Sequence, residues 1–226
     1  LPLGPSLPNW TPSRVPPLDA MIGRFCRLVP LDPDQHSDAL FQAFSQNDEN
    51  QGSWTYLPYG PFDRFGHFDN WLRDTCLGSD PHFHTIMDVA TERPVGLASY
   101  LRIEPSSGVI EVGHIHYSPL LQRTPAATEA MYLMMKRVFD ELGYRRYQWK
   151  CDALNAKSRR AAERLGFQFE GLFRQAAIYK GRNRDTSWYS IIDEEWPQRR
   201  AAFEQWLSPE NFDSHGLQKH ALETFR

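Results

Sequence analysis

The sequence predicts an α+β domain with a mixed β-sheet at its centre. Between residues 83 and 117, segments with the two-residue alternation of strands follow one another across short turns, as in an antiparallel meander. After residue 128 the period lengthens to that of a helix, and a strand, a second helix and two more strands follow. A strand–helix–strand crossover gives parallel pairing, so we expect the sheet to be antiparallel first and parallel at the crossover.

The sheet of about seven strands and its helices are predicted at defined positions. The expected strands are 23–31, 83–90, 95–102, 109–117, 146–152, 167–179 and 188–192. The expected helices are 33–44, 65–76, 128–142, 156–165 and 197–206. Asp32 and Pro33 make a typical helix start, and Gly143 and Gly166 are placed to end their helices. The chain is therefore divided into a Pro-rich extended arm over 1–20, one domain over 21–196, and a C-terminal helix and tail over 197–226.

Composition limits the classes of protein to which this chain can belong. Its 226 residues are 41% hydrophobic and 13% aromatic, which is enough for a real core. A net charge of −3 argues against a nucleic-acid-binding protein, and no apolar run reaches the ~18 residues of a membrane span. The first residues lack the regions of a signal peptide, and Cys26, Cys76 and Cys151 have no metal-like spacing. We expect a cytoplasmic protein with reduced thiols, without metal, nucleic-acid or membrane partners, as a monomer or homodimer.

Two polar loops, each leading into a helix, carry the functional signal. Backbone N–H groups converge where a loop after a strand enters a helix, and they can hold an anionic group there. The first loop is Gln122-Arg123-Thr124-Pro125-Ala126-Ala127. The second region comprises Asn155-Ala156-Lys157-Ser158, Ala161 to Phe167 (AAERLGF), Glu170-Gly171, Arg174 and Gly181 to Asp185.

Together these loops resemble the acetyl-CoA-binding half of the GNAT N-acetyltransferases. The second region is similar to the N-x-x-S…RLGF…EG…R pattern of the branch that includes the ribosomal-protein N-terminal acetyltransferases. In the first loop the family has Gln or Arg, two residues, Gly, one residue, then Gly or Ala; here Pro125 replaces the first Gly. Proline removes one N–H donor but is tolerated in a first helical turn, with Thr124 available as the cap.

The resemblance implies a sheet whose fourth and fifth strands splay apart to admit the pantetheine arm of acetyl-CoA, the cosubstrate. The arm would bond to the free edge of the fourth strand, and Gly113 is a natural place for the bulge that separates the strands. A backbone N–H near His114 or Ile115 would polarise the thioester carbonyl. The expected cofactor contacts are Ile115, the amides of Gln122, Arg123, Thr124, Ala126 and Ala127, and the side chains of Asn155 and Ser158.

The acceptor amine must be neutral to attack, so a base or a chain of waters is required. Glu111 is the first candidate, because a carboxylate at that position serves as base in many relatives. His114 is the second, since its ordinary pKa suits the task. Alternation places His114 and His116 on one face and Glu111 on the other, unless a bulge lies between them. Ser158 is the candidate acid for the leaving thiolate.

Structural roles compete with each of these assignments. Glu111 could be a solvated strand residue, the histidines could be core or surface groups, and Asn155 could be only a helix cap. The aromatic loop with Trp54, Tyr56 and Tyr59 suits a wall of the acceptor pocket, although packing explains it nearly as well.

Two functions therefore compete for this chain. The first is acetyl transfer by direct attack of a primary amine, either a protein N-terminus or a small amine, in a ternary complex. The second is an acyl-CoA-binding module without turnover, which Pro125 and the absence of Tyr from 156–165 favour.

Overall fold

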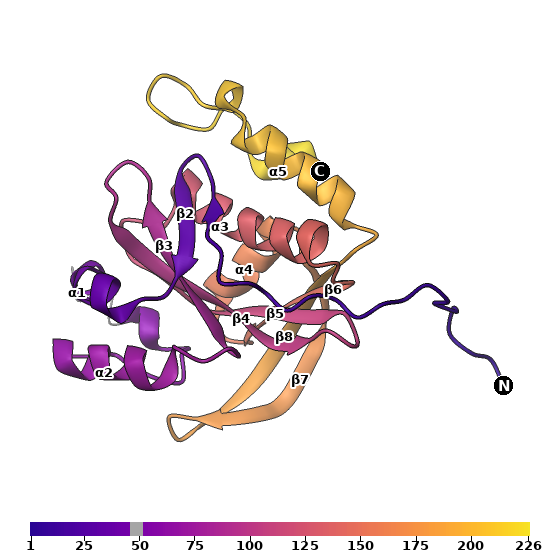
Figure 1. Ribbon diagram of the computed structural model, residues 1–226, viewed down its shortest axis with the longest axis horizontal. Helices are drawn as coiled ribbons and strands as arrows, with labels where there is room; N and C mark the ends of the chain where they lie inside the picture. Colours follow the sequence, from indigo (N-terminus) through magenta and orange to yellow (C-terminus); the bar gives the residue numbers. More distant parts are fainter. Residues whose placement is uncertain (46–51) are drawn as a thin grey trace.

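The computed structural model describes residues 1–45 and 52–226. The described residues form one eight-stranded sheet with the order β1-β2-β3-β4-β5-β6-β8-β7. Helices α1 and α2 lie on one side of this sheet, and α3, α4 and α5 lie on the other (Figure 1). The strands pair antiparallel except for the parallel pair of β5 and β6. The predicted α+β class with a mixed sheet is confirmed.

The strands are β1 Met21–Ile22, β2 Cys26–Pro30, β3 His82–Asp88, β4 Pro94–Glu104, β5 Val109–Tyr117, β6 Arg146–Asp152, β7 Gln168–Tyr179 and β8 Arg182–Ile192. The helices are α1 Pro33–Phe44, α2 Phe65–Thr75, α3 Pro125–Lys136, α4 Ala156–Leu165 and α5 Trp196–Leu207. A π-helical turn, η2 Arg137–Glu141, continues α3, and the short 3-10 helices η3 Pro209–Asn211 and η4 Leu222–Phe225 lie in the C-terminal tail.

The strand predicted over 23–31 is present but starts later: β2 covers Cys26–Pro30, and a turn separates it from the two-residue strand β1, with which it forms a hairpin. The buried carboxylate of Glu129 on α3 accepts the backbone N–H groups of Arg24, Phe25 and Cys26 at 2.8, 2.6 and 2.8 Å. Hydrogen bonds to a charged acceptor are stronger than those between neutral groups, so this contact holds the turn in place of continued strand pairing. The two-residue strand β1 is the strand by which the sheet exceeds the predicted seven.

Two other predicted elements have different limits. The helix predicted over 128–142 begins three residues earlier, because Thr124 caps it and Pro125 occupies its first position, and it ends in the π-helical turn η2. The strand predicted to begin at Trp188 begins at Arg182. The turn before it therefore comprises only Lys180 and Gly181, both with positive φ.

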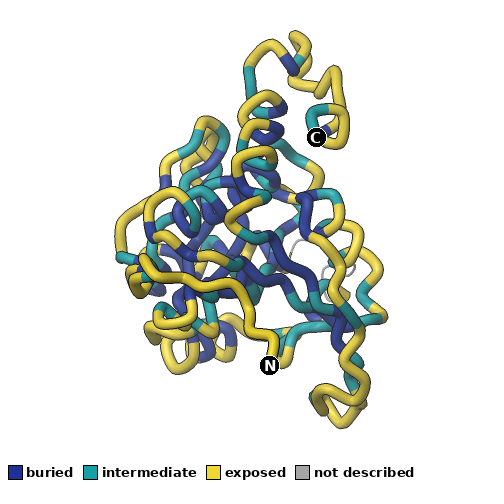
Figure 2. Tube along the Cα trace, turned by 90° about the vertical axis from the view of Figure 1, so that its right-hand side faces the viewer, coloured by how far each residue is buried: buried dark blue, intermediate teal, exposed yellow. Residues whose placement is uncertain are grey.

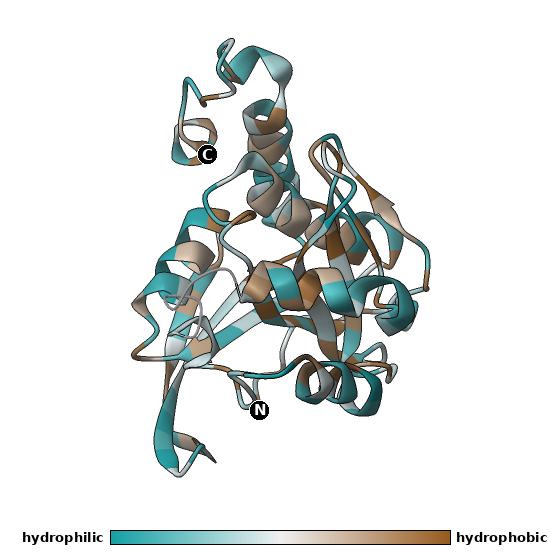
Figure 3. Cartoon of the chain, turned by 90° about the vertical axis from the view of Figure 1, so that its left-hand side faces the viewer, coloured by the Kyte–Doolittle hydropathy of each residue, from teal (hydrophilic) through white to brown (hydrophobic). Residues whose placement is uncertain are grey.

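Each face of the sheet has its own apolar core. Met131, Met134 and Met135 of α3 are buried in the larger core, which also contains residues of α4 and α5. The smaller core joins α1 and α2 to β3 and β4, with Leu97 at its centre. Figure 2 shows the buried residues gathered on the sheet and on the inner sides of its helices, and Figure 3 shows the apolar residues in the same places.

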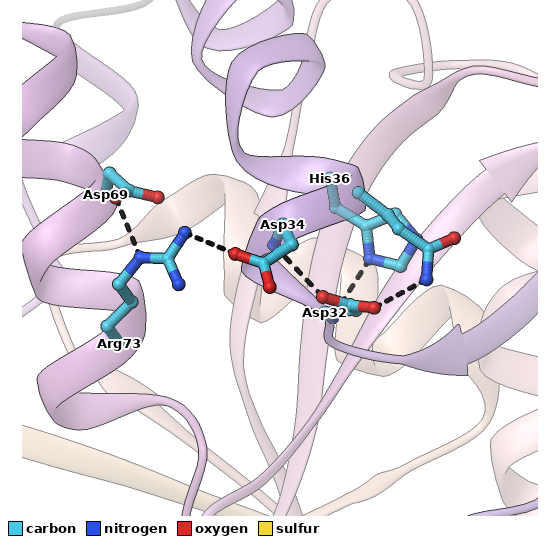
Figure 4. A network of polar contacts seen from close by, with 6 residues as sticks. Asp32, Asp34, His36, Asp69 and Arg73 are labelled. Atoms are coloured by element: carbon cyan, nitrogen blue, oxygen red, sulfur yellow. Dashed lines mark hydrogen bonds and ion pairs between the residues drawn. The ribbon is translucent and has the colours of Figure 1, made fainter.

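The helices α1 and α2 are joined by polar contacts at their exposed sides (Figure 4). Asp32 caps α1 by accepting the N–H of Asp34 at 3.0 Å. Asp34 in turn pairs with Arg73 of α2 at 2.7 Å, and Arg73 also pairs with Asp69 one turn earlier, at 2.8 Å. These exposed contacts supplement the packing of α1 on α2 in the smaller core, which also contains Trp54 of the aromatic loop.

Three further observations concern the chain as a whole. Within residues 1–45 and 52–226, every helix is too short or too polar to cross a membrane. The three cysteines are buried and free of disulfides. In the same described part of the chain, His, Cys, Asp and Glu side chains form no group of three that could hold a metal ion.

Candidate functional site

The strands β5 and β6 separate halfway along their length. Val109–Val112 pairs in parallel with Arg146–Trp149, and in the described chain no β5–β6 pairing continues beyond these four residues. The remaining part of β5, residues 113–117, stays paired with β4 on its other side. We call this separation the wedge; the paired residues 109–112 and 146–149 form its closed end, and its open end is at Tyr117.

A β-bulge in β5 lies where the wedge begins. Gly113 faces Ser99 and His116 faces Leu97, so His114 and Ile115 together oppose the single residue Ala98 of β4. His114 takes a left-handed conformation with φ of 50°. The bulge therefore lies immediately after Gly113, as expected.

The bulge places Glu111 and His116 on one face of the sheet, which is the exception that the alternation prediction allowed. Cross-strand partners lie on the same face of a sheet, and the partners of Glu111 and His116 are Leu101 and Leu97, which are four residues apart on β4. Glu111 and His116 therefore share the face covered by α1 and α2. Simple alternation placed them on opposite faces because it did not count the extra residue.

His114 is a neutral imidazole in an aromatic environment. Its Nδ1 lies 2.8 Å from the hydroxyl of Tyr59, and its ring packs beside Phe83. Burial, and to a smaller extent the positive charge of Arg102, lower the pKa of His114 to about 4. At pH 7 the ring is uncharged and can accept a proton.

Glu111 is buried between two cations. Its Oε1 accepts a hydrogen bond from Arg102 at 2.7 Å, and its Oε2 lies 2.8 Å from Lys150 Nζ in an ion pair. The ammonium group of Lys150 also lies 3.7 Å from the ring centre of Trp188. Burial lowers the pKa of Lys150, and its contact with Glu111 opposes this shift. The solvated-residue interpretation of Glu111 is therefore wrong.

The three aromatic residues predicted for the acceptor pocket contact residues beside the open part of the wedge. Trp54 stacks on His116 with 3.8 Å between ring centres, and Tyr59 contacts His114. Tyr56 donates its hydroxyl to the backbone oxygen of Leu154 at 3.1 Å, in the loop before α4. Burial lowers the pKa of His116 to about 3, so this ring is a neutral part of the aromatic cluster.

The hairpin of β7 and β8 adds polar contacts that the sequence did not predict. Lys180 donates to the backbone oxygen of Trp54 at 2.8 Å, and the Tyr179 hydroxyl donates to Asp152 Oδ2 at 2.8 Å. Like Arg102 and Lys150, these residues were missed because their contacts depend on strand register. Along β6, Gln148, Lys150 and Asp152 alternate with apolar residues. This pattern alone predicts that the three polar side chains lie on one face of the sheet.

The loop before α3 uses several of its predicted donors internally. The N–H groups of Gln122, Thr124 and Ala127 donate to backbone oxygens of Ser118, Leu121 and Thr124. Within the described residues, the N–H groups of Arg123 and Ala126 have no acceptor. Arg123 has a positive φ of 63°, which turns the chain sharply before the helix. A surface hollow beside this helix start is lined by Thr124, Pro125 and Ala126 together with Arg24, Phe25 and residues 88–90.

Asn155 and Ser158 belong to the first turn of α4. The side chain of Asn155 caps this helix by accepting the N–H of Ser158 at 3.0 Å. The hydroxyl of Ser158 accepts the indole N–H of Trp149 at 3.0 Å. The expected cap is confirmed, and Ser158 is fixed beside β6 where that strand leaves its pairing with β5.

Comparison with known proteins agrees with this geometry. The family described as "Acetyltransferase (GNAT) domain" matches residues 26–168. A crystal structure of a GCN5-related N-acetyltransferase from Brucella melitensis is 47% identical, with a TM-score of 0.94 over 97% of this chain and 99% of that one. A probable GNAT-family acetyltransferase from Chromobacterium violaceum is 42% identical, with a TM-score of 0.80 over 87% of this chain and 98% of that one.

A more distant structure shares the fold alone. The microcin C7 self-immunity acetyltransferase MccE, solved in complex with acetyl-CoA and AMP, is 18% identical, with a TM-score of 0.66 over 79% of this chain and 98% of that one. Comparison of the sequence with curated proteins gave no match. The family match over more than half of the chain and the two relatives above 40% identity agree with the split sheet and its bulge: the chain belongs to the GNAT family and is an acetyltransferase.

Proposed function

We propose that the protein transfers the acetyl group of acetyl-CoA to a primary amine at the α1/α2 face of the wedge. The observation that carries this proposal is the end of β5–β6 pairing at Val112, followed at once by the bulge at His114 and Ile115. A strand edge without a partner offers main-chain donors and acceptors to an extended ligand.

The chain has groups suited to each part of acetyl-CoA. Residues 113–117 of β5 would bond to the pantetheine amides as a neighbouring strand does. The N–H groups of Arg123 and Ala126, which have no acceptor among the described residues, would hold the pyrophosphate at the start of α3. Asn155 would meet the pantetheine from α4 while it caps that helix. An N–H at Ile115 or His114 would stabilise the negative charge that develops on the thioester oxygen.

His114 is the better general base of the two candidates. It is neutral at pH 7, and when its Nδ1–H donates to Tyr59, its Nε2 is free to take a proton from the attacking amine. Glu111 can do the same only if it gives up a contact with Arg102 or Lys150. We therefore assign Glu111 to holding these two cations in place at the acceptor face.

The acceptor we favour is the N-terminal amine of a protein. This assignment rests on the run from Asn155 to Arg174, which resembles the pattern of the branch that includes the ribosomal-protein N-terminal acetyltransferases. Lys180 and Tyr56 join the aromatic loop to the β7–β8 turn and to the loop before α4, and the acceptor would enter beside these contacts. A small amine is the alternative acceptor.

The test is to incubate the protein with acetyl-CoA and a pooled set of amines that includes N-terminal peptides. Free thiol release and melting temperature are followed together, and mass spectrometry identifies the acetylated product. We expect thiol release that depends on peptide, with higher melting temperature in acetyl-CoA. Stabilisation without thiol release for any amine would support the binding module instead, and the absence of both would contradict the cosubstrate assignment.

A further inference from the structure

The Pro-rich N-terminal segment lies against the closed end of the wedge. Trp10 donates its indole N–H to the backbone oxygen of Ser106 at 3.0 Å, and the Ser13 N–H donates to the oxygen of Pro105 at 3.0 Å. Both acceptors lie in the turn that leads from β4 into β5. Figure 1 shows this segment running from the N-terminus along the sheet toward β1, and Figure 2 shows most of its length exposed.

The same segment also holds the turn that leads into β6. The hydroxyl of Ser13 donates to the backbone oxygen of Gly143 at 2.9 Å, and the N–H of Arg14 donates to that of Leu142 at 3.0 Å. Ser13, only 9% exposed, therefore bonds through its N–H to the entry of β5 and through its side chain to the entry of β6. These are the two strands that separate.

Trp10 covers Gly108, whose backbone oxygen links the start of β5 to the start of β6 by hydrogen bonds. The backbone oxygen of Gly108 accepts the N–H groups of Arg145 and Arg146 at 2.9 and 3.0 Å. A Cβ at Gly108 would stand 2.4 Å from the Trp10 ring, so the indole lies directly on this glycine. The guanidinium of Arg145 lies 5.5 Å from the centre of the same ring.

Beyond Arg14 the segment continues to the far edge of the sheet. The buried guanidinium of Arg137, in the π-helical turn, donates to the backbone oxygens of Asp19 and Ala20 at 2.5 and 3.1 Å. Met21 then begins β1, and the side chain of Met21 is buried in the larger core. Residues 10–20, which we call the brace, thus link the β6 side of the wedge to the β1 edge on the other side.

We propose that the brace fixes the opening of the wedge, and that Trp10 and Ser13 are positioning residues for acetyl-CoA binding. Within the described residues, four parallel residue pairs join β5 to β6, and the brace adds hydrogen bonds to the turns that lead into both strands next to these pairs. A wedge free to change its opening must lose that freedom when the ligand binds, and pre-organisation removes this cost. This inference rests on the proposed use of the wedge for acetyl-CoA.

The experiment compares three chains with the unaltered protein. One lacks residues 1–6, which precede every brace contact; one lacks residues 1–14; and one carries Trp10→Ala with Ser13→Ala. Acetyl-CoA affinity is measured by calorimetry at a temperature well below the melting point of each chain. Hydrogen exchange is followed over 109–117 and 146–152 without ligand.

We expect the chain lacking 1–6 to bind like the unaltered protein. The other two should bind about tenfold more weakly, as expected for about 1.4 kcal/mol of lost pre-organisation, and exchange faster over 109–112 and 146–149. Lower melting temperatures with unchanged affinity and exchange would overturn the proposal, because the brace would then only stabilise the fold. If the unaltered protein does not bind acetyl-CoA, the proposed function is wrong. In that case, unchanged hydrogen exchange in the chain lacking 1–14 would also show that the brace does not fix the opening of the wedge.

Discussion

At the scale of single residues, burial and charge separate the roles of two candidate bases on one strand. His114 is surrounded by Tyr59 and Phe83, and with Arg102 nearby its charged form is disfavoured. The side chain of Glu111, three residues earlier, forms ion pairs with Arg102 and Lys150. Apolar surroundings favour a neutral proton acceptor at His114, whereas both oxygens of Glu111 are occupied by ion pairs with the two cations.

His114→Gln should lower the rate of acetyl transfer by about 10² to 10⁴. The reason is that glutamine preserves a polar side chain but cannot take the proton of the amine. Acetyl-CoA affinity should stay unchanged, and the wild-type rate should lose its His114-dependent part as the pH falls through about 4, where this imidazole becomes charged. Steady-state kinetics and calorimetry measure the two effects. A wild-type rate in His114→Gln would remove His114 from the mechanism.

Asn155 combines a cap with a proposed cosubstrate contact, and two substitutions separate these roles. Asn155→Ala should reduce stability by about 0.5–2 kcal/mol through loss of the cap, and acetyl-CoA binding by about 1–2 kcal/mol. Asn155→Ser keeps a capping oxygen but lacks the amide, so it should restore the stability and leave the binding weak. Urea unfolding and calorimetry provide the comparison. Full affinity in Asn155→Ser would leave Asn155 with the capping role alone.

At the scale of elements, the limits of two helices were predicted correctly, and capping residues mark their starts. The helices 33–44 and 156–165 have capping residues at their starts, and both have the predicted limits. The strand 109–117 also matches, but its bulge reversed the face of Glu111 relative to His116. Alternation cannot show where an extra residue enters a strand, because this depends on pairing with a distant partner.

The candidate site was predictable to a similar extent. The aromatic loop was assigned to the acceptor side, and Trp54, Tyr56 and Tyr59 do reach the residues around the wedge. The cations around Glu111 were not found, because Arg102 and Lys150 approach it from the two neighbouring strands. A charge far along the chain becomes a partner only when strand order and register are known.

Glu129 is the clearest case of an element defined from a distance, and it yields a stability prediction. Glu129→Ala leaves three N–H groups of the β1–β2 turn without their acceptor, so the free energy of unfolding should fall by about 3 kcal/mol. Glu129→Gln keeps one acceptor oxygen and should lose less. Urea unfolding monitored by circular dichroism gives both values. A loss below about 0.5 kcal/mol, typical of a surface substitution, would mean that the turn holds itself.

At the scale of the whole molecule, buried histidines predict a loss of stability in mild acid. Burial lowers the pKa values of His36, His82, His84, His114 and His116, and the values for His84 and His116 fall to about 3. Between pH 6.5 and these values the unfolded chain binds more protons than the folded one. Stability should therefore be complete above pH 6.5 and decline as the pH falls toward 4.

Urea midpoints at pH 7.5, 6 and 5 measure this decline. His84→Phe removes one buried titrating ring whose two nitrogens have no partner within the described residues, and Phe keeps a flat aromatic ring at this position. This variant should show a shallower decline than the unaltered protein. Equal slopes would exclude His84 as a contributor, and a midpoint constant from pH 7.5 to 5 would contradict the histidine explanation as a whole.

Hydrogen exchange by mass spectrometry with and without acetyl-CoA tests whether the wedge binds the cosubstrate. In the proposed complex, the β5 edge that has left β6 receives the pantetheine arm and the start of α3 receives the pyrophosphate. We predict that acetyl-CoA protects residues 113–117 and 122–127, while the exposed C-terminal tail around 213–220 exchanges as before. Binding of acetyl-CoA without protection of 113–117 would contradict the account.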